Sequence, residues 1–342
     1  MSKFTGLKSA RILAGAATAA LLSTQAQTAD VTLTISSWAP PSHAMNAEMW
    51  PNLIKMIEGA TDGKVTAEIR YGLAPPPAQM DVVMDGAADI TWIFNGYNPG
   101  RFVATKLIEL PGYEGNAQAA STAYWRVYEA MLADLDEHKG VKVIGLMTHG
   151  PGQFHSRKPV NSLADIGGMK VRIGGGVAGD VGAALRMSGI RVPAPKVYET
   201  LDSGAADAVA MPAEGRLSFR LTEVAPHFYT MPGGLYRGAF ALIMNEDTFA
   251  SLSEDQQKAL QEKVFGEPLS TMAGAVWDAA DKRGIDATAA DAENTMTVAS
   301  ASDQEAFAEI AAEVINKVKA EINAMGVDAD AAIAMIREEM AN

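Results

Sequence analysis

A short unit recurs in the two halves of this 342-residue chain, and it constrains the fold more than any other feature. Residues 84–90 and 201–208 each carry Gly-Ala-Ala-Asp after an apolar helical turn and before a strand-like apolar run. Glycine suits the left-handed position that closes a helix, so each copy predicts a helix, a tight turn and a strand. Similar units in both halves predict two similar lobes.

The segments around these units alternate between strand-like and helical patterns. Residues 31–35 and 65–71 show the period of two that is typical of strands, and Met45, Met49, Leu53 and Ile57 have helical spacing. Residues 90–94, 141–147 and 169–173 are also strand-like, whereas residues 78–86 and 180–187 favour helices. This alternation predicts an α/β fold with mainly parallel sheets. In the last third, an apolar stripe predicts one long helix that carries Phe307, Ile310, Val314, Val318 and Ile322.

The first 26 residues have the pattern of a secretory signal peptide. A basic start (Lys3, Lys8 and Arg11) precedes an apolar run at 12–22 and then small residues. We expect cleavage after Ala26, with Ala29 as the alternative site. The apolar run is shorter than a comfortable bilayer span, so an uncleaved membrane anchor is the less favoured interpretation.

Composition excludes several classes of function. Cleavage of 26 residues from 342 leaves 316, which is more than one core usually serves, so two domains are expected. The formal net charge of −13 includes the three cations of the signal peptide, and an acidic chain without basic tracts argues against nucleic acid or anionic lipid as a partner. With no cysteine, the chain has no disulfides, no thiolate nucleophile and no Cys-ligated zinc. The five histidines show no metal-ligand spacing, so no metal site is expected.

Two α/β lobes on an acidic, exported chain suggest a ligand clamp, because ligands bind outside the carboxyl ends of strands and lobes can close over them. In residues 169–173, Lys170 and Arg172 point to the face opposite the apolar side chains, and Arg172 lies near the carboxyl end. A guanidinium matches a carboxylate with two parallel hydrogen bonds. Arg172 is therefore a candidate anchor for an organic acid. The alternative is a structural salt bridge.

Further pocket candidates lie near the ends of other predicted strands. Trp38 follows the first strand, and Tyr97 lies in the loop after the strand at 90–94. Trp92 and Phe94 belong to that apolar strand; Trp92 is also a candidate for ligand contact, although such residues are more often core. The remaining candidates are Gln153, Phe154, Met211, Glu214, His43 and His149. If Glu214 lines a pocket for an anion, we expect the ligand to carry an amino or hydroxyl group.

Two enzyme-like patterns carry little weight. Residues 174–179 fit the dinucleotide fingerprint G-x-G-x-x-G, but the match is mid-chain, in an exported protein, without a suitable ribose-binding acid. We therefore expect no cofactor. These glycines would still permit close backbone approach, and the helix after them would offer free N–H groups to an anion. No Gly-x-Ser-x-Gly elbow is present, so we predict no catalytic residues and no enzyme.

The block Pro-x-x-Ser-Leu-Ala-Asp-Ile-x-Gly-Met-Lys-Val-Arg at 159–172 resembles the signature of the substrate-binding proteins of TRAP transporters (tripartite ATP-independent periplasmic transporters, DctP type). Matches in the same order cover nearly the whole mature chain, at residues 34–43, 62–65, 86–89, 197–207 and 245–260.

This resemblance implies a type II-like periplasmic binding fold with crossing strands and a long helix that bridges the lobes. We expect residues 29–150 and 238–280 in lobe 1, and residues 151–237 and 281–342 in lobe 2. The resemblance also implies a periplasmic monomer that holds the carboxylate of an organic acid with Arg172. Its partner would be a two-part membrane permease driven by a sodium gradient.

The chain departs from the family pattern in three places, which puts the identity of the ligand in doubt. Gly174 follows Ile173 where many members continue with Val-Pro, Gly152 stands where some place a second arginine, and Met211 replaces an asparagine. A pocket without the second cation suits a monocarboxylate better than a dianion. The alternatives are a sugar or peptide binder of an ATP-driven importer, a periplasmic enzyme on the same fold, and a sensor or accessory binding protein.

Overall fold

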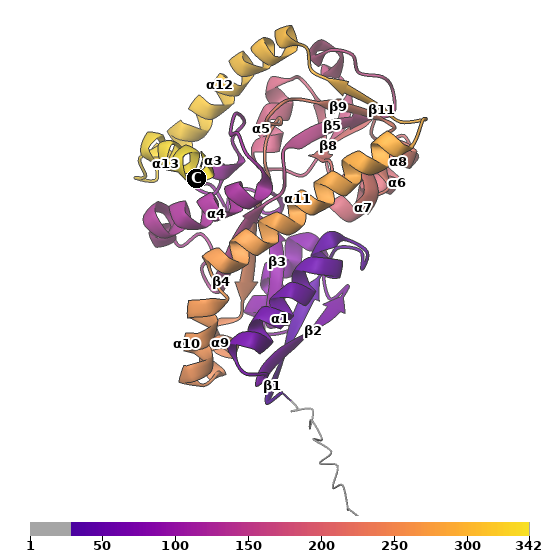
Figure 1. The fold of residues 1–342 in the computed structure, drawn as a ribbon. Helices are drawn as coiled ribbons and strands as arrows, with labels where there is room; N and C mark the ends of the chain where they lie inside the picture. The colour runs from indigo at the N-terminus through magenta and orange to yellow at the C-terminus, as the bar shows by residue number, and fades with distance from the viewer. Residues whose placement is uncertain (1–28, 342) are drawn as a thin grey trace, which may run out of the picture.

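The computed structural model describes residues 29–341 and contains two β-sheets covered by helices (Figure 1). The predicted signal peptide at 1–26 lies outside the described residues. The predicted fold class is confirmed, because each sheet forms the centre of one α/β lobe. Figure 1 shows helix α11 (Glu267–Ala290) running obliquely past both lobes, and α11 contacts strands of both sheets.

The first sheet has the strand order β2-β1-β3-β10-β4. Its strands are β1 (Val31–Ser37), β2 (Val65–Tyr71), β3 (Ile90–Phe94), β4 (Lys142–Thr148) and β10 (Ala239–Met244). Strand β1 is parallel to β2 and β3, whereas β10 is antiparallel to both β3 and β4. The sheet is therefore mixed. Its antiparallel strand is β10, which enters the sheet only after the chain has formed most of the second lobe.

The second sheet has the strand order β11-β9-β5-β8-β6-β7. Its strands are β5 (Gly152–Ser156), β6 (Lys170–Ile173), β7 (Ser188–Arg191), β8 (Ala208–Pro212), β9 (His227–Thr230) and β11 (Thr295–Val298). Strand β5 is antiparallel to both neighbours, and the other pairs are parallel. The expectation of mainly parallel sheets thus fails at β5 and β10, the strands next to the crossings between lobes.

The repeated Gly-Ala-Ala-Asp unit has the same structure in both lobes. Helix α2 (Gln79–Met84) is followed by Gly86 at φ 69° and then β3, and helix α6 (Val197–Asp202) by Gly204 at φ 72° and then β8. The aspartate of each copy accepts a hydrogen bond from the neighbouring strand, from the Thr34 N–H to Asp89 at 2.7 Å and from the Lys170 N–H to Asp207 at 3.0 Å. The unit therefore positions the entry of a strand beside its neighbour.

The C-terminal region covers one side of both lobes. Helix α12 (Ala301–Asn323) buries Phe307, Val314, Val318 and Ile322, as the apolar stripe predicted, and α13 (Ala329–Ala341) packs on α4 (Ala117–Val127). The remaining helices are α1 (Trp50–Ala60), α3 (Lys106–Glu109), α5 (Val177–Ala184), α7 (Gly215–Ser218), α8 (Leu221–Val224), α9 (Glu246–Ser251) and α10 (Glu254–Lys263). Among residues 29–341, no helix has the length and apolar character needed to cross a membrane.

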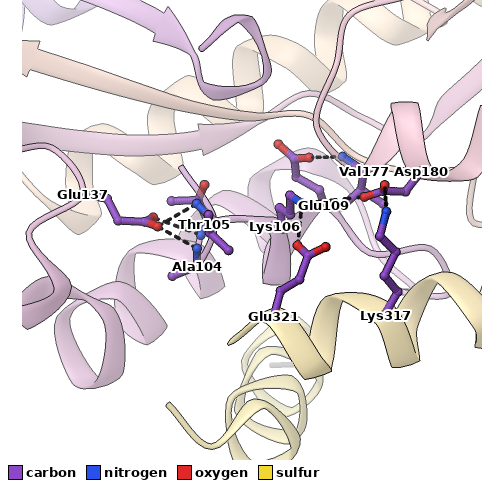
Figure 2. Close-up of polar contacts among 10 residues, drawn as sticks. Ala104, Thr105, Lys106, Glu109, Glu137, Val177, Asp180, Lys317 and Glu321 are labelled. Atoms are coloured by element: carbon purple, nitrogen blue, oxygen red, sulfur yellow. Dashed lines mark hydrogen bonds and ion pairs between the residues drawn. The ribbon is translucent and has the colours of Figure 1, made fainter. Parts of the chain in front are cut away.

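A polar network ties α3 to elements of the second lobe (Figure 2). The Lys106 ammonium lies 2.6 Å from Glu321 of α12, and Lys317 of α12 pairs with Asp180 of α5. The Glu109 carboxylate accepts hydrogen bonds from the N–H of Val177 at 2.7 Å and of Ala239 at 3.2 Å. Because Val177 begins α5 and Ala239 begins β10, Glu109 links the two lobes.

Candidate functional site

A cavity lies where the two lobes meet, with about 420 Å³ of empty space between its walls, counting the part that opens to solvent. Its lining combines residues after β1 and β3 of the first sheet with residues at the carboxyl ends of β6 and β8 of the second. This is the place where α/β folds bind ligands. The lining residues are Trp38, His43, Trp92, Phe94, Tyr97, His149, Arg172, Gly174, Ala194, Met211, Pro212, Glu214, Phe219, Tyr236, Phe240 and Trp277.

Arg172 lies at one end of this cavity and is only 3% exposed. Its Nε donates to the Val192 carbonyl at 2.8 Å, and its Nη2 donates to the Tyr97 hydroxyl at 3.3 Å. The Tyr97 oxygen also accepts from the Ala194 N–H at 2.7 Å. Within the described part of the chain, Arg172 forms no ion pair, so the predicted alternative of a structural salt bridge is not observed. The guanidinium is held in place and keeps donors for a ligand.

A run of neighbouring rings lines the cavity and begins beside Arg172. The Tyr97 and Trp38 ring centroids are 6.0 Å apart, and Trp38 stacks on Trp92 at 4.1 Å with an interplanar angle of 11°. Trp92 in turn lies 5.7 Å from the ring of His43. The Trp38 indole donates to the Trp92 carbonyl at 3.0 Å, which fixes the stack.

A second run of rings joins the same two ends. Tyr97 lies 4.8 Å from Phe94, and Phe94 lies 5.0 Å from Phe240. Phe240 is 5.5 Å from Trp277, whose ring is 5.6 Å from His43. Trp92 also stacks on Phe240, with ring centroids 5.5 Å apart, and lies 6.3 Å from Trp277. The two runs are therefore in contact and form one continuous aromatic lining of a slot with Arg172 at one end and His43 at the other.

The far end of the slot contains His43 and Glu214, each 1% exposed. His43 Nε2 lies 3.6 Å from Glu214 Oε2, too far for a hydrogen bond. Burial lowers the pKa of His43 to about 3, so the pair is not an ion pair at neutral pH. Burial raises the pKa of Glu214 to about 8; a hydrogen bond from Ser218 opposes this rise, and the nearby Asp281 carboxyl, which accepts from the Glu214 N–H at 2.7 Å, adds to it.

Two other polar side chains line the cavity but already have partners. His149 Nδ1 is 2.6 Å from the Gly150 carbonyl, and burial lowers the pKa of His149 to about 4. The Tyr236 hydroxyl donates to the Ala210 carbonyl at 3.2 Å. Arg172, His43 and Glu214 therefore offer a ligand unused hydrogen-bonding capacity, and so does the Trp277 indole N–H, which lines the cavity and has no partner.

The structure places eight of the ten candidate residues in this cavity. They are Arg172, Trp38, Trp92, Tyr97, Met211, Glu214, His43 and His149. Gln153 and Phe154 do not line it: the Gln153 amide exchanges hydrogen bonds with the Met231 backbone, and Phe154 is fully buried in the core.

Several lining residues were not among the sequence candidates. Phe94 was assigned to the core, and Phe219, Tyr236, Phe240 and Trp277 belong to segments far from any motif. Phe240 and Trp277 carry no local signal, because they reach the cavity only through the crossing strand β10 and the bridging helix α11.

The glycine run at 174–176 serves close packing between the lobes. Gly175 has φ +113°, and a Cβ there would lie 2.2 Å from the Gly96 carbonyl oxygen; a Cβ at Gly176 would lie 2.2 Å from Glu109 Oε2. The expectation that the following helix offers free N–H groups to a ligand is wrong for its first residue, since the Val177 N–H is taken by Glu109. Among residues 29–341, no cluster of three or more potential metal ligands occurs.

Comparison with known proteins gives one consistent result. A family model described as bacterial extracellular solute-binding protein, family 7 (DctP), matches residues 35–321. A TRAP periplasmic solute-binding protein from Bordetella bronchiseptica, solved with bound (R)- and (S)-mandelate, is 38% identical with a TM-score of 0.87, over 91% of this chain and 98% of that one. A TRAP solute-binding protein from Rhodoferax ferrireducens, in complex with copurified benzoate, is 29% identical with a TM-score of 0.84, over 91% and 97%. A protein named outer membrane transporter protein TsaT, from Comamonas testosteroni, is 27% identical over 260 residues, 75% of this chain and 77% of that protein.

Proposed function

We propose that this chain, which belongs to family 7 of the bacterial extracellular solute-binding proteins (DctP), binds an aromatic monocarboxylic acid between its lobes and delivers it to the membrane permease of a TRAP transporter. The observation that carries the proposal is the position of Arg172, a buried cation without an acidic partner among the described residues, at the end of a slot with aromatic walls.

An aromatic ligand fits the walls of the slot. Eight of its lining residues are Trp, Phe or Tyr: Trp38, Trp92, Phe94, Tyr97, Phe219, Tyr236, Phe240 and Trp277. All but Tyr236 belong to the series of rings that runs from Arg172 to His43 and the adjacent Phe219. Aromatic rings interact favourably with another ring in offset or edge-to-face geometry. The two similar structures were solved with mandelate and benzoate, both aromatic monocarboxylates.

A single carboxylate fits the charges of the slot. Arg172 is the only lysine or arginine among the residues that line this cavity. Arg237, the buried cation nearby, donates to the Gly115 carbonyl and does not line it. A second carboxylate would lie near Glu214 with no cation to compensate it, and burying an unpaired charge is costly. Dianions should therefore bind weakly.

Binding without turnover is the expected activity, since the family consists of transport proteins and the slot is organised for holding an anion. The predicted signal peptide supports export to the periplasm, and the family relationship supports docking to a permease. Closure of the two lobes over the ligand would bury it and present one surface for docking.

A thermal-shift titration tests the proposal, with benzoate and mandelate compared against succinate and glucose. At about 100 times the dissociation constant, a ligand adds about 2.7 kcal/mol of stability, which raises the midpoint of a chain of this size by roughly 4 °C. Loss of the buried partner of a carboxylate costs about 2–5 kcal/mol, so Arg172→Met should weaken binding at least about 30-fold.

Arg70→Met is the matched control, because it removes the same charge from a side chain that is 59% exposed on β2. It should leave the shift with benzoate intact. A shift with glucose or succinate but not with the aromatic acids, or an unchanged benzoate shift in Arg172→Met, would refute the proposed function.

A further inference from the structure

We propose that His43 and Glu214 form a subsite for a hydroxyl group, so that the preferred ligand is an aromatic acid hydroxylated at the end of the ring opposite its carboxylate. This inference rests on the proposed function and adds the chemical group that the far end of the slot selects.

The first observation is an unsatisfied acceptor that lines the cavity. Glu214 Oε2 is buried and has no hydrogen-bond partner, and His43 Nε2 lies 3.6 Å from it. Buried polar atoms are nearly always hydrogen-bonded. Because both side chains line the cavity, a third group placed beside the pair could bond to both atoms.

The second observation fixes which nitrogen of His43 carries the proton. The Met45 N–H donates to His43 Nδ1 at 3.2 Å, so Nδ1 is an acceptor and must be unprotonated. The neutral imidazole then carries its proton on Nε2. Toward the slot, His43 can only donate a hydrogen bond, and Glu214 Oε2 can accept one in the carboxylate form, which dominates above the Glu214 pKa of about 8 and which a donated hydrogen bond stabilises.

A ligand group that satisfies both side chains must accept from Nε2–H and donate to Oε2. A hydroxyl group does both through one atom. An ammonium group cannot accept, an ether oxygen cannot donate, and a bare ring edge does neither. Phenolic hydroxyl is the group that matches the pair on an aromatic ligand.

The third observation places the subsite opposite the carboxylate anchor. Both runs of rings start at Tyr97, which is bonded to Arg172, and end at His43. Phe219, 5.4 Å from the His43 ring, closes the end beside Glu214. A ring held in the slot with its carboxylate on Arg172 therefore directs its meta or para position toward His43 and Glu214.

Isothermal titration of the mature chain with benzoate, 3-hydroxybenzoate, 4-hydroxybenzoate and 4-aminobenzoate tests the inference. One hydroxylated acid should bind at least about tenfold more tightly than benzoate, because a site with unpaired polar groups discriminates against an analogue that lacks the matching group. The aminobenzoate should not share this gain, since its nitrogen is a poor acceptor.

Two substitutions connect the preference to the pair. In His43→Asn, the new side chain keeps an acceptor for the Met45 N–H but loses the Nε2 donor. Glu214→Met keeps the length of the side chain and removes its carboxyl group. In each variant, the ratio of the affinity for the preferred hydroxybenzoate to the affinity for benzoate should fall toward one. In Arg70→Met, at the surface, the ratio should stay at the wild-type value.

The outcomes separate this inference from the proposed function. If no aromatic acid binds, the proposed function fails. If benzoate binds and depends on Arg172 but the hydroxylated acids bind no more tightly, the subsite alone is refuted. A preference for the aminobenzoate, or an unchanged ratio in His43→Asn, would also overturn it. The comparison of ligands on the wild type stands even if Glu214→Met does not fold.

Discussion

Gly175→Ala should weaken ligand binding through the contact between the lobes. Gly175 lies between β6 and α5 of the second lobe, and Gly96 follows β3 of the first. The added Cβ would be 2.2 Å from the Gly96 carbonyl oxygen, whereas ordinary contact begins at 3.4 Å. The two segments would have to move apart by about 1 Å, because the Cβ meets backbone and not a flexible side chain.

The substitution has two costs that act on different equilibria. Gly175 has φ +113°, and an L residue there costs roughly 1–2 kcal/mol whether the lobes are apart or together. This cost lowers the midpoint of unfolding by roughly 1.5–3 °C. The clash with Gly96 exists only when the lobes meet. Overpacking costs about 1–3 kcal/mol, and a cost confined to the closed state weakens binding by roughly 5- to 150-fold.

Gly168→Ala separates the two costs. Gly168 has φ +82°, and a Cβ there has nothing within 4 Å, so the variant carries backbone strain without a clash. Both variants should lower the midpoint in a thermal scan, and only Gly175→Ala should weaken benzoate in isothermal titration. Equal benzoate affinities for the two variants would refute the argument that the approach of Gly175 to Gly96 belongs to the bound state.

Three further predictions concern stability. Burial raises the pKa of Glu109 to about 7, so the wild type loses stability as the pH rises from about 4.5 through 7. The unfolding midpoint of Glu109→Gln minus that of the wild type, measured by calorimetry, should therefore become more positive between pH 5 and 8. A difference that does not change with pH would contradict this. Burial lowers the pKa of His138 to about 4, so stability is lost as the pH falls from 6.5 toward 4; His138→Phe should gain most over the wild type at pH 5 in thermal scans, and a gain confined to pH 8 would count against the argument. A Cβ at Gly284 of α11 would lie 2.0 Å from the Ala213 carbonyl oxygen, whereas a Cβ at Gly59 of α1 would have nothing within 4 Å. Gly284→Ala should therefore lower the midpoint in thermal scans, and Gly59→Ala should raise it, because alanine stabilises a helix by roughly 0.5–1 kcal/mol relative to glycine. The reverse order would show that the structure around Gly284 adapts to the added methyl group.

Local signals were enough to predict the main features of the fold and the position of Arg172, whose role as the anchor stays a prediction. The repeated unit predicted two lobes because its glycines close their own helices and its aspartates hold the strand that lies beside their own. Arg172 was predictable because alternation along a strand decides which face a side chain points to, and the carboxyl end of β6 decides where it lies. The boundaries of the lobes along the chain stay a prediction.

The missed features depend on contacts between distant segments. Helix α5 begins at Val177, three residues before the predicted start, and it has no side-chain cap from its own sequence. Its first N–H is satisfied by Glu109, which is 68 residues away. Phe240 and Trp277 complete a wall of the slot only after β10 has crossed back and α11 has packed over both lobes. No local pattern contains that information.

Burial resolves a conflict between the overall charge of the chain and its proposed ligand. The formal net charge is −13, so the field of the protein repels an organic anion. Inside the closed slot, the pair between Arg172 and a carboxylate is stronger than in water because fewer solvent dipoles screen it. The same burial raises the pKa of Glu214 to about 8 and that of Asp281 to about 7. These acids therefore present less negative charge at neutral pH than their number suggests. One cation is then sufficient for one carboxylate, and Glu214 is free to recognise a hydroxyl group instead of repelling the ligand.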